Sequence, residues 1–496
     1  MPDATNPPGS VQHPMSAQDA LWLTMDRPNN LMVIDGVMLL ESMPDWETVL
    51  DTVTERVLDR FWVFRCRAQQ YDDRWVWEED ANFDLEQHVH RVQLPEPCGV
   101  AELEEYVADM RSRPLPRDRP LWEVAVVDGV VTENGESGAA IVSRFHHSIA
   151  DGVRLTQVML SLCDTSDPHV AAPVGRRDAN SGPAALATTA AEAVAEAVTD
   201  TARAVTRGAA AVGDDARGAL LSGWRIATDL LRHPAHLVDA FDAMGVDSRL
   251  ANTTGSVAKL ALRGSTVQTI WSGTPGVRKA VAWSAPFALE PVKTIGRAYD
   301  ASVNDVLLTA IAGGLHDYLQ EHGAGDITEV EWMVPVNLLP IDDNLPDDLG
   351  NYFALVMAVL PLLPDDSIER LRAVSARMSR IKRSAEPLLT FGVQRGVSAA
   401  PGPLSVALTD FFANKAVGVL TNVPGPRAPM SFAGASVRQI VGFAPSSGDQ
   451  PMTCTIFSYA GNVTIGFATD AGLIPKPAHL VDNTLAELAR LVDGDR

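Results

Sequence analysis

The chain has 496 residues, of which 46% are apolar and 21% are charged. This balance excludes a wholly disordered chain, and the length indicates more than one domain. The formal net charge of −23 excludes a molecule-wide nucleic-acid-binding surface and argues against simple electrostatic adhesion to anionic lipid.

The cysteines and the first residues bear on where the protein works. Cys66, Cys98, Cys163 and Cys454 are widely spaced and include no C-x-x-C pair, so we expect reduced, mostly buried thiols. Segment 1–14 is polar and proline-rich, unlike a signal peptide, and no apolar run reaches the roughly 18 residues of a membrane span. We therefore expect a cytoplasmic protein that is soluble or lies on a membrane surface.

The first part of the chain alternates between predicted helices and strands. Helical spacing of apolar residues predicts helices at 16–25, 45–61 and 152–163. Strand-forming residues between turn signals predict strands at 31–40, 121–128 and 138–145.

From about residue 166 the composition changes to an alanine-rich stretch that favours helix but offers little apolar area to bury. Segment 220–244 carries apolar residues typical of a packing face, with a membrane-contacting helix as the alternative. After residue 271, strands are predicted at 279–283, 330–336, 353–360, 418–422 and 462–469, and helices at 289–299, 304–321, 368–384 and 477–492. We therefore predict an N-terminal domain over 1–170, a helical connection over 171–270 and a C-terminal domain over 271–496.

The turn between the predicted strand 138–145 and the predicted helix 152–163 carries recognisable chemistry. Residues 145–152 read F-H-H-S-I-A-D-G. Catalytic groups are often held on such turns. A neutral imidazole can take a proton from a hydroxyl, which makes His147 or His146 a candidate base. Asp151 could orient the imidazole directly or brace the turn from behind.

Other interpretations stay open from the residues alone. The paired histidines could be buried packing residues, or could bind a metal, although no Cys or Glu lies at a recognisable spacing nearby, and we predict no metal site. Ser148 and His147 could form a dyad, although no nucleophile-elbow motif surrounds Ser148. His88 and His90 supply only two ligands, so we interpret them as packing or surface residues.

An ordered set of motifs covers nearly the whole chain. The histidine turn matches H-H-x-x-x-D-G, the signature of the coenzyme-A-dependent acyltransferase superfamily, and the chain as a whole resembles the bacterial wax ester synthase/diacylglycerol acyltransferase family. The other matching segments are 15–20 (M-S-A-Q-D-A), 120–123 (P-L-W-E), 302–306 (S-V-N-D-V), 334–336 (V-P-V), 350–351 (G-N), 422–426 (N-V-P-G-P) and 457–461 (F-S-Y-A-G). One departure is N-L-L-P at 337–340, where relatives usually have S-L-R.

The resemblance implies roles for the residues of the histidine turn. His147 would be the general base that deprotonates the acceptor hydroxyl, whose oxygen attacks the thioester carbonyl. His147 would then return the proton to the departing thiolate of coenzyme A. His146, Asp151 and Gly152 complete the motif, with Asp151 and Gly152 in a structural role.

Two further motifs are implied to lie near the substrate. Asn304 and Asp305 match the family's N-D pair, in which the amide of Asn304 could donate to the oxyanion or hold the wall of the site. Pro120, Leu121 and Trp122 would shape the acyl tunnel or pack structurally.

The resemblance also implies an α/β fold of two chloramphenicol-acetyltransferase-like domains with a tunnel between them. The expected reaction moves a long-chain acyl group from acyl-CoA, a substrate and not a cofactor, to diacylglycerol or a fatty alcohol. We expect no other cofactor. We expect peripheral contact with a membrane or lipid droplet. The alternatives are transfer to another alcohol, such as a polyketide or glycolipid hydroxyl, or a catalytically inactive lipid-binding protein.

Overall fold

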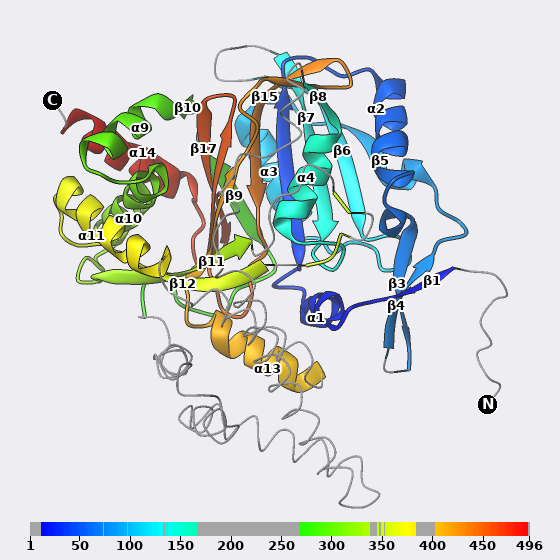
Figure 1. Cartoon of the computed structure of the whole chain (residues 1–496), viewed down its shortest axis with the longest axis horizontal. Helices are drawn as coiled ribbons and strands as arrows, with labels where there is room; N and C mark the ends of the chain where they lie inside the picture. Colours follow the sequence, from blue (N-terminus) through cyan, green and yellow to red (C-terminus); the bar gives the residue numbers. More distant parts are fainter. Residues whose placement is uncertain are drawn as a thin grey trace, which may run out of the picture.

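The computed structural model describes residues 11–165 apart from 73, 97, 132–134 and 136, and residues 268–494 apart from 338–344, 347–348, 352 and 383–401. The predicted connection over 171–270 lies outside the described residues except at its last positions, as do segment 220–244 and residues 338–340 of the N-L-L-P departure. The described chain forms two large mixed β-sheets with helices packed on them (Figure 1).

The first large sheet, called here the N-terminal sheet, has seven strands. Their order is β5 (Val89–Gln93), β6 (Trp122–Val131), β7 (Ser137–His146), β2 (Val33–Leu40), β15 (Ala435–Phe443), β14 (Met430–Phe432) and β8 (Cys163–Thr165). Strand β7 is buried along its length after Ser137, because it pairs with β6 on one side and β2 on the other. Its last residue, His146, therefore enters the histidine turn from inside the sheet.

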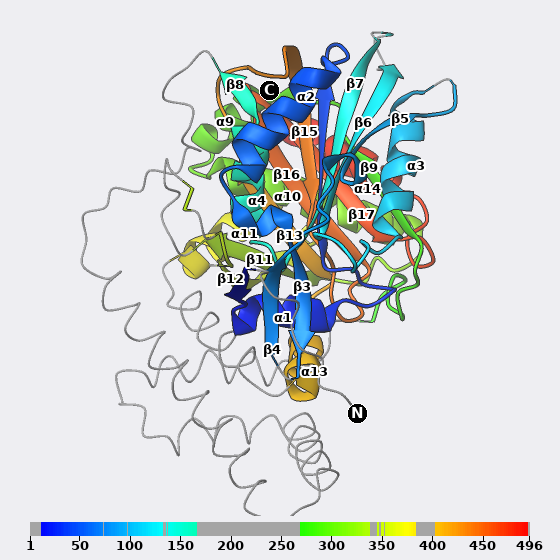
Figure 2. The ribbon, with the colours of Figure 1, turned by 90° about the vertical axis from the view of Figure 1, so that its right-hand side faces the viewer.

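Helices and a small sheet surround this half. The helices are α1 (Ala17–Met25), α2 (Trp46–Val53), α3 (Val100–Arg111) and α4 (Gly152–Ser161), with 3-10 turns at Trp62–Arg65 and Leu85–Gln87. A three-stranded sheet is formed by β1 (Gln12–Pro14), β4 (Arg74–Glu79) and β3 (Cys66–Tyr71). Figure 2 shows β3 and β4 extending beside α1.

The helix predicted at 45–61 is confirmed as far as Leu58, but its last three residues are not helical. Helix α2 ends at Val53 and continues as a single π-helical turn over Thr54–Leu58. The Thr54 hydroxyl donates to the Leu50 carbonyl, and Asp59 N–H reaches back five residues to the Thr54 carbonyl. The chain then becomes extended at Phe61, whose side chain is fully buried. Burial of Phe61 in the core decides the end of this helix, and local spacing does not reveal it.

The second large sheet, called here the C-terminal sheet, also has seven strands. Its order is β10 (Phe287–Ala288), β17 (Asn462–Asp470), β16 (Met452–Tyr459), β13 (Gly418–Pro424), β11 (Glu329–Asn337) and β12 (Phe353–Pro361), with β9 (Lys279–Trp283) also paired to β17. Helices α9 (Leu289–Ala298), α10 (Val303–Glu321), α11 (Ser367–Lys382) and α14 (Ala478–Asp493) gather on one side of it, whereas α13 (Gly402–Ala413) lies apart near α1 (Figure 1).

Helix α10 is the central helix of this half and is buried on nearly every side. It packs closely on α14, where a Cβ on Gly314 would lie 2.6 Å from the backbone nitrogen of Thr484. A side chain at that position would separate the two helices, so close approach requires glycine there.

The two sheets do not divide the chain at a single point. Strands β14 and β15 follow β13 of the C-terminal sheet in sequence, yet β15 pairs with β2 and β14 with β8 in the N-terminal sheet. Gln439 of β15 joins the two sheets, because its buried amide donates to the Ser284 carbonyl and to the Thr464 hydroxyl. This crossing brings strands of both sheets around one cavity.

All four cysteines are buried and free, as predicted. Burial raises the pKa of the Cys66 and Cys163 thiols to about 12. None of the helices within the described residues is long and apolar enough to cross a membrane.

Candidate active site

The histidine turn is held at both of its ends by backbone hydrogen bonds. His147 N–H donates to the Met32 carbonyl just before β2, at 2.8 Å. Asp151 is the N-cap of α4, and its Oδ1 accepts from Arg154 N–H at 3.0 Å. An N-cap of this kind satisfies a free N–H of the first helical turn. Asp151 therefore braces the turn, the second of the two roles that the sequence left open.

The imidazole of His147 packs against two aromatic rings that also neighbour each other. Trp22 of α1 stacks on one face of the imidazole, with ring centroids 3.9 Å apart and planes at 23°. Phe353 of β12 lies beside both rings, with its centroid 5.6 Å from that of His147 and 6.2 Å from that of Trp22. Nδ1 is buried and has no hydrogen-bond partner among the described residues. His147 lines the cavity, so Nε2 is the nitrogen available to a substrate.

The surroundings of His147 favour its neutral form. Burial lowers its pKa from 6.5 to about 4, and the neighbouring His146 acts in the same direction. Its own backbone carbonyl and the amide of Asn351 oppose this shift. At neutral pH the imidazole is uncharged and able to accept a proton.

His146 faces away from the cavity and serves the turn. Ser148 N–H donates to His146 Nδ1 at 3.1 Å, and the Ser148 hydroxyl lies 2.8 Å from the same nitrogen. Nδ1 is therefore the acceptor, and the proton is carried by Nε2, 3.8 Å from Asp26 Oδ2. Burial lowers the pKa of His146, and Asp26 opposes this effect. Because the Ser148 hydroxyl is directed at His146, it forms no dyad with His147.

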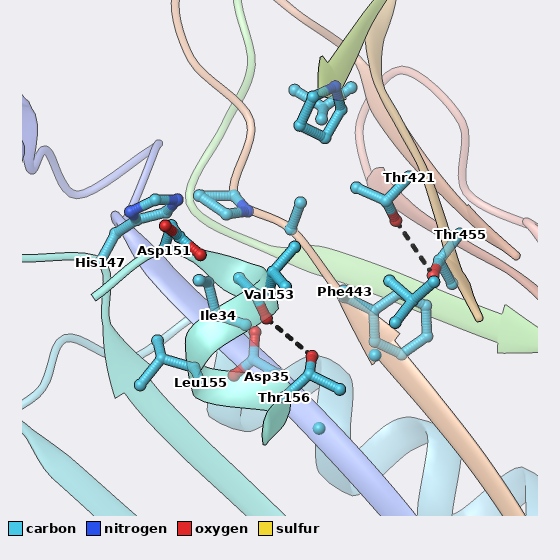
Figure 3. Close-up of a pocket in the computed structure, with 18 of the residues that line it drawn as sticks. Ile34, Asp35, His147, Asp151, Val153, Leu155, Thr156, Thr421, Phe443 and Thr455 are labelled. Carbon is cyan, nitrogen blue, oxygen red and sulfur yellow. Dashed lines mark hydrogen bonds between the residues drawn. The ribbon is translucent and has the colours of Figure 1, made fainter. Parts of the chain in front are cut away.

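A mostly apolar cavity begins at His147 and is lined from both sheets. The N-terminal sheet contributes β2, β7 and β15 together with α4, and the C-terminal sheet contributes β11, β12, β13 and β16. The apolar lining includes Met32, Ile34, Met38, Phe145, Leu155, Met159, Met333, Leu355, Phe443 and Phe457. Figure 3 shows His147 and Asp151 on one side of the cavity and Thr421 and Thr455 on the other.

Polar groups in the cavity wall are few and mostly satisfied. Asp35 is buried and accepts from Arg144 Nε at 3.1 Å, and it also pairs with Arg111. The hydroxyl of Thr421 donates to that of Thr455 at 3.2 Å. An apolar cavity with a few fixed polar groups suits a long hydrocarbon chain attached to a polar reacting group.

Gly152, the last residue of the histidine motif, also lines the cavity. A Cβ at this position would meet only Ile34 Cδ1, at 3.8 Å, so no protein contact requires glycine here. The absence of a side chain at Gly152 leaves open space in the cavity beside His147.

Pro120, Leu121 and Trp122 lie behind the histidine turn and are not among the residues that line the cavity. The Leu121 carbonyl accepts from His146 N–H at 3.0 Å, and Trp122 Nε1 donates to the Phe64 carbonyl at 2.8 Å. His88 is buried against this motif, stacked on Trp122 and bonded through Nδ1 to the Trp122 carbonyl. These contacts favour a packing role for the P-L-W motif over a role in shaping the acyl tunnel, and they also place His88 as a packing residue.

Asn304 and Asp305 both lie in the first turn of α10. Asp305 forms a capping box with Ser302, whose N–H donates to Asp305 Oδ2 at 2.9 Å. Asn304 Oδ1 accepts from Asn422 Nδ2 at 2.8 Å, and Asn422 lines the cavity. The N-D and N-V-P-G-P motifs thus meet, and Asn422 is the member of this pair that faces the substrate space.

The closest neighbours of His147 were not predicted as site residues. Trp22 and Phe353 belong to elements whose patterns indicate ordinary packing, and Asn351 was noted only within the G-N motif. The G-N motif itself is the sequence signal that could have indicated Asn351 as a site residue. No group of three or more His, Cys, Asp or Glu side chains suited to a metal occurs within the part of the chain that the structure describes.

Comparisons with known proteins identify the family of the chain. A family model described as wax ester synthase/diacylglycerol acyltransferase catalytic domain matches residues 15–307, and the corresponding C-terminal domain model matches 349–492. A probable diacylglycerol O-acyltransferase of Mycobacterium tuberculosis is 26% identical over 472 residues, which covers 93% of this chain and 90% of the relative. A putative diacylglycerol O-acyltransferase of the same organism is 28% identical over 423 residues, which covers 80% of this chain and 77% of the relative.

Solved structures share the fold. The wax ester synthase/diacylglycerol acyltransferase from Marinobacter aquaeolei VT8 superposes with a TM-score of 0.64 at 19% identity, covering 97% of this chain and 99% of the other. The first condensation domain of the calcium-dependent antibiotic synthetase superposes with a TM-score of 0.54 at 15% identity, covering 97% and 96%. At these identities the likeness concerns the fold, which is the two-part α/β architecture predicted from the sequence.

Proposed function

Since this chain belongs to the wax ester synthase/diacylglycerol acyltransferase family, it is an O-acyltransferase of neutral-lipid synthesis, and we propose that His147 is the general base of its reaction. The observation that carries this proposal is the placement of His147. Its Nδ1 is buried, its ring is stacked on Trp22, and it lines an apolar cavity formed by strands of both sheets. A base in this position can serve two substrates that meet in one cavity.

The substrates are acyl-CoA and a lipid alcohol. In the proposed step, His147 Nε2 takes the hydroxyl proton while the alcohol oxygen attacks the thioester carbonyl carbon. The tetrahedral intermediate collapses with cleavage of the C–S bond, and the imidazolium gives its proton to the departing thiolate. Since proton transfer and addition–elimination suffice, we propose no cofactor besides acyl-CoA as substrate.

The amide of Asn422 is the neutral donor that we assign to the cavity wall. Its Nδ2 is held by Asn304 at 2.8 Å. A fixed amide dipole stabilises developing negative charge better than a mobile one does. Asn304 would then contribute by holding the amide of Asn422 in place. Asp305 would contribute by capping α10, the helix that carries Asn304.

For the acceptor we propose diacylglycerol or a fatty alcohol. The mostly apolar lining of the cavity supports this assignment, as do the names of the relatives. Both alcohols partition into lipid, so we also propose peripheral contact of the enzyme with a membrane or lipid droplet. Flotation of the protein with diacylglycerol-containing vesicles, compared with vesicles lacking it, tests that contact.

Thiol release from palmitoyl-CoA tests the reaction, with diacylglycerol or hexadecanol as acceptor. His147→Ala is compared with His316→Ala, which removes a buried histidine of α10 that does not line the cavity. We expect acceptor-dependent release by wild type and His316→Ala, and a loss of at least about 100-fold in His147→Ala.

Two outcomes would contradict the proposal. Undiminished release by His147→Ala would remove the role of His147. No release with either acceptor from folded wild type would redirect the acceptor assignment to other alcohols, such as a polyketide or glycolipid hydroxyl, or to a lipid-binding protein without turnover.

A further inference from the structure

Asn351 is a buried amide that joins three segments far apart in the chain. It is 6% exposed, and its Nδ2 donates to Asp19 Oδ1 at 2.7 Å and to the His147 carbonyl at 3.0 Å. Both hydrogens of the amide nitrogen are thereby directed at acceptors. This fixes which end of the amide faces which neighbour, and Oδ1 is left as the free end.

Two buried polar atoms beside this junction are complementary. Asn351 Oδ1 and His147 Nδ1 are each enclosed and without a hydrogen-bond partner among the described residues. One is an acceptor, and the other carries a proton in the tautomer whose Nε2 lone pair faces the cavity. A buried polar atom without a hydrogen-bond partner costs free energy. Since Asn351 already donates to the His147 carbonyl, an interaction between Asn351 Oδ1 and His147 Nδ1–H would reduce that cost for both atoms. Asn351 also favours the protonated form of His147, which opposes the effect of burial on its pKa.

The segments that carry Asp19 and Asn351 also hold the imidazole ring. Trp22 lies one helical turn after Asp19 in α1, and Phe353 lies two residues after Asn351 at the start of β12. Gly350, next to Asn351, forms a β-bridge with Ala150, and its carbonyl accepts from Asp151 N–H at 3.2 Å. Backbone, amide and ring contacts from the same two segments therefore converge on His147.

We propose that Asn351, anchored by Asp19, is a positioning residue that holds Nδ1–H of His147 toward its amide and thereby directs the Nε2 lone pair into the cavity. The inference rests on the proposed function, in which His147 is the base. Asn351 does not touch the reacting atoms. It selects the tautomer and fixes the direction of the group that does.

The first experiment compares Asn351→Ala with Gln439→Ala. Gln439 is a matched control, because its buried amide nitrogen also donates to two acceptors, one of them a backbone carbonyl, and neither acceptor is near His147 in the hydrogen-bond network. We expect Asn351→Ala to lower kcat about 30-fold with KM within about twofold, whereas Gln439→Ala keeps kcat within about threefold. Melting temperatures of the two variants should fall by similar amounts.

The second experiment separates positioning from simple packing. In the double variant Asp19→Asn/Asn351→Asp, an amide at 19 can donate to a carboxylate at 351, so the contact between these two residues is kept. The hydrogen bond to the His147 carbonyl is lost, as it is in Asn351→Ala. A carboxylate beside His147 stabilises the imidazolium. The other titratable groups around His147 are His146 on its own turn, with Asp26 behind it, and Asp151, and all are unchanged. We expect the low-pH inflection of kcat/KM to rise by at least about one pH unit and kcat to recover above that of Asn351→Ala.

The outcomes distinguish this inference from the proposed function. If His147→Ala is inactive while Asn351→Ala behaves like Gln439→Ala, the positioning role of Asn351 is contradicted, whereas the role of His147 as base is retained. An unmoved pH inflection in the folded double variant also overturns the positioning role. Full turnover by His147→Ala would instead remove the base itself.

Discussion

Trp22 lies flat against the imidazole of His147, with ring centroids 3.9 Å apart. Trp22 belongs to α1, whereas His147 follows strand β7, an interior strand of the N-terminal sheet. The indole covers one face of the imidazole, restricts its rotation and excludes water from that face. Helix α1 therefore forms part of the surroundings of His147, the proposed base, and its position relative to β7 affects the direction of the imidazole.

Replacing Trp22 tests this relationship. We expect Trp22→Leu to lower kcat about tenfold, because a stacked aromatic pair contributes roughly 1 kcal/mol beyond its buried area and holds the ring in place. Trp22→Phe retains a flat ring and should keep most of the activity. Initial rates of thiol release with saturating acceptor check both variants. Equal kcat for Trp22→Leu and wild type would show that the stack does not orient the base.

The lowered pKa of His147 predicts an unusual pH profile. The proposed reaction requires a neutral imidazole, and burial lowers the pKa of His147 from 6.5 to about 4. We therefore expect kcat/KM to stay level from neutral pH down to about pH 5 and to fall tenfold per pH unit below about 4. An inflection near 6.5 would contradict this assignment.

Two controls belong to the pH measurement. The 3′-phosphate of coenzyme A titrates near 6, so thioesters of dephospho-CoA must give the same profile. In the unfolded chain His147 binds a proton below about 6.5, which the folded chain does not bind until about 4, so stability falls as the pH decreases through this window. Recovery of activity after return to pH 7.5 distinguishes protonation of the base from unfolding.

Gly152→Ala tests the space beside the base. Its nearest protein atom would be Ile34 Cδ1 at 3.8 Å, so the methyl group fits without moving the fold. It occupies cavity volume next to His147, and we expect kcat/KM to fall roughly tenfold, the effect of about one methyl group in a close-fitting pocket. The melting temperature should be unchanged or slightly raised. Wild-type kcat/KM would show that substrate does not pass beside Gly152.

Asp305→Ala tests the cap of α10. Loss of the capping box with Ser302 should cost about 1 kcal/mol of stability, because the Ser302 N–H loses its acceptor at a partly buried helix end. KM for both substrates should stay within about twofold of wild type if Asp305 acts on the helix alone. A large rise in KM without loss of stability would instead place Asp305 at the substrate.

For Asn304→Ala we expect the opposite result, with stability retained and activity reduced. The pair that it forms with Asn422 is exposed, so the melting temperature should hardly change. The amide of Asn422 becomes free to rotate, and we expect kcat to fall about tenfold if that amide stabilises the oxyanion. Asn422→Ala should give the same loss, and the double variant should lose no more than either single variant. Additive losses would show that the two amides act separately.

The sequence predicted those parts of the site that are contiguous in the chain. Strand β7, the histidine turn and helix α4 follow one another, so the strand-forming run, the turn residues and the helical spacing of α4 could be found locally. Most helices and strands of the C-terminal half were confirmed within a few residues for the same reason. The ordered motifs identified the family and with it the reaction class.

Tertiary structure alone decided what surrounds His147. Trp22, Asn351 and Phe353 come from segments more than 100 residues away from it on one side or the other, and each has a local pattern that is also typical of ordinary packing. The crossing of β14 and β15 into the N-terminal sheet was likewise not predicted, because a strand pattern reveals burial and period but not the partner strand. Local propensity depends on neighbouring residues, whereas the cavity and its base depend on which buried surfaces meet, and that choice is made only when the whole chain folds.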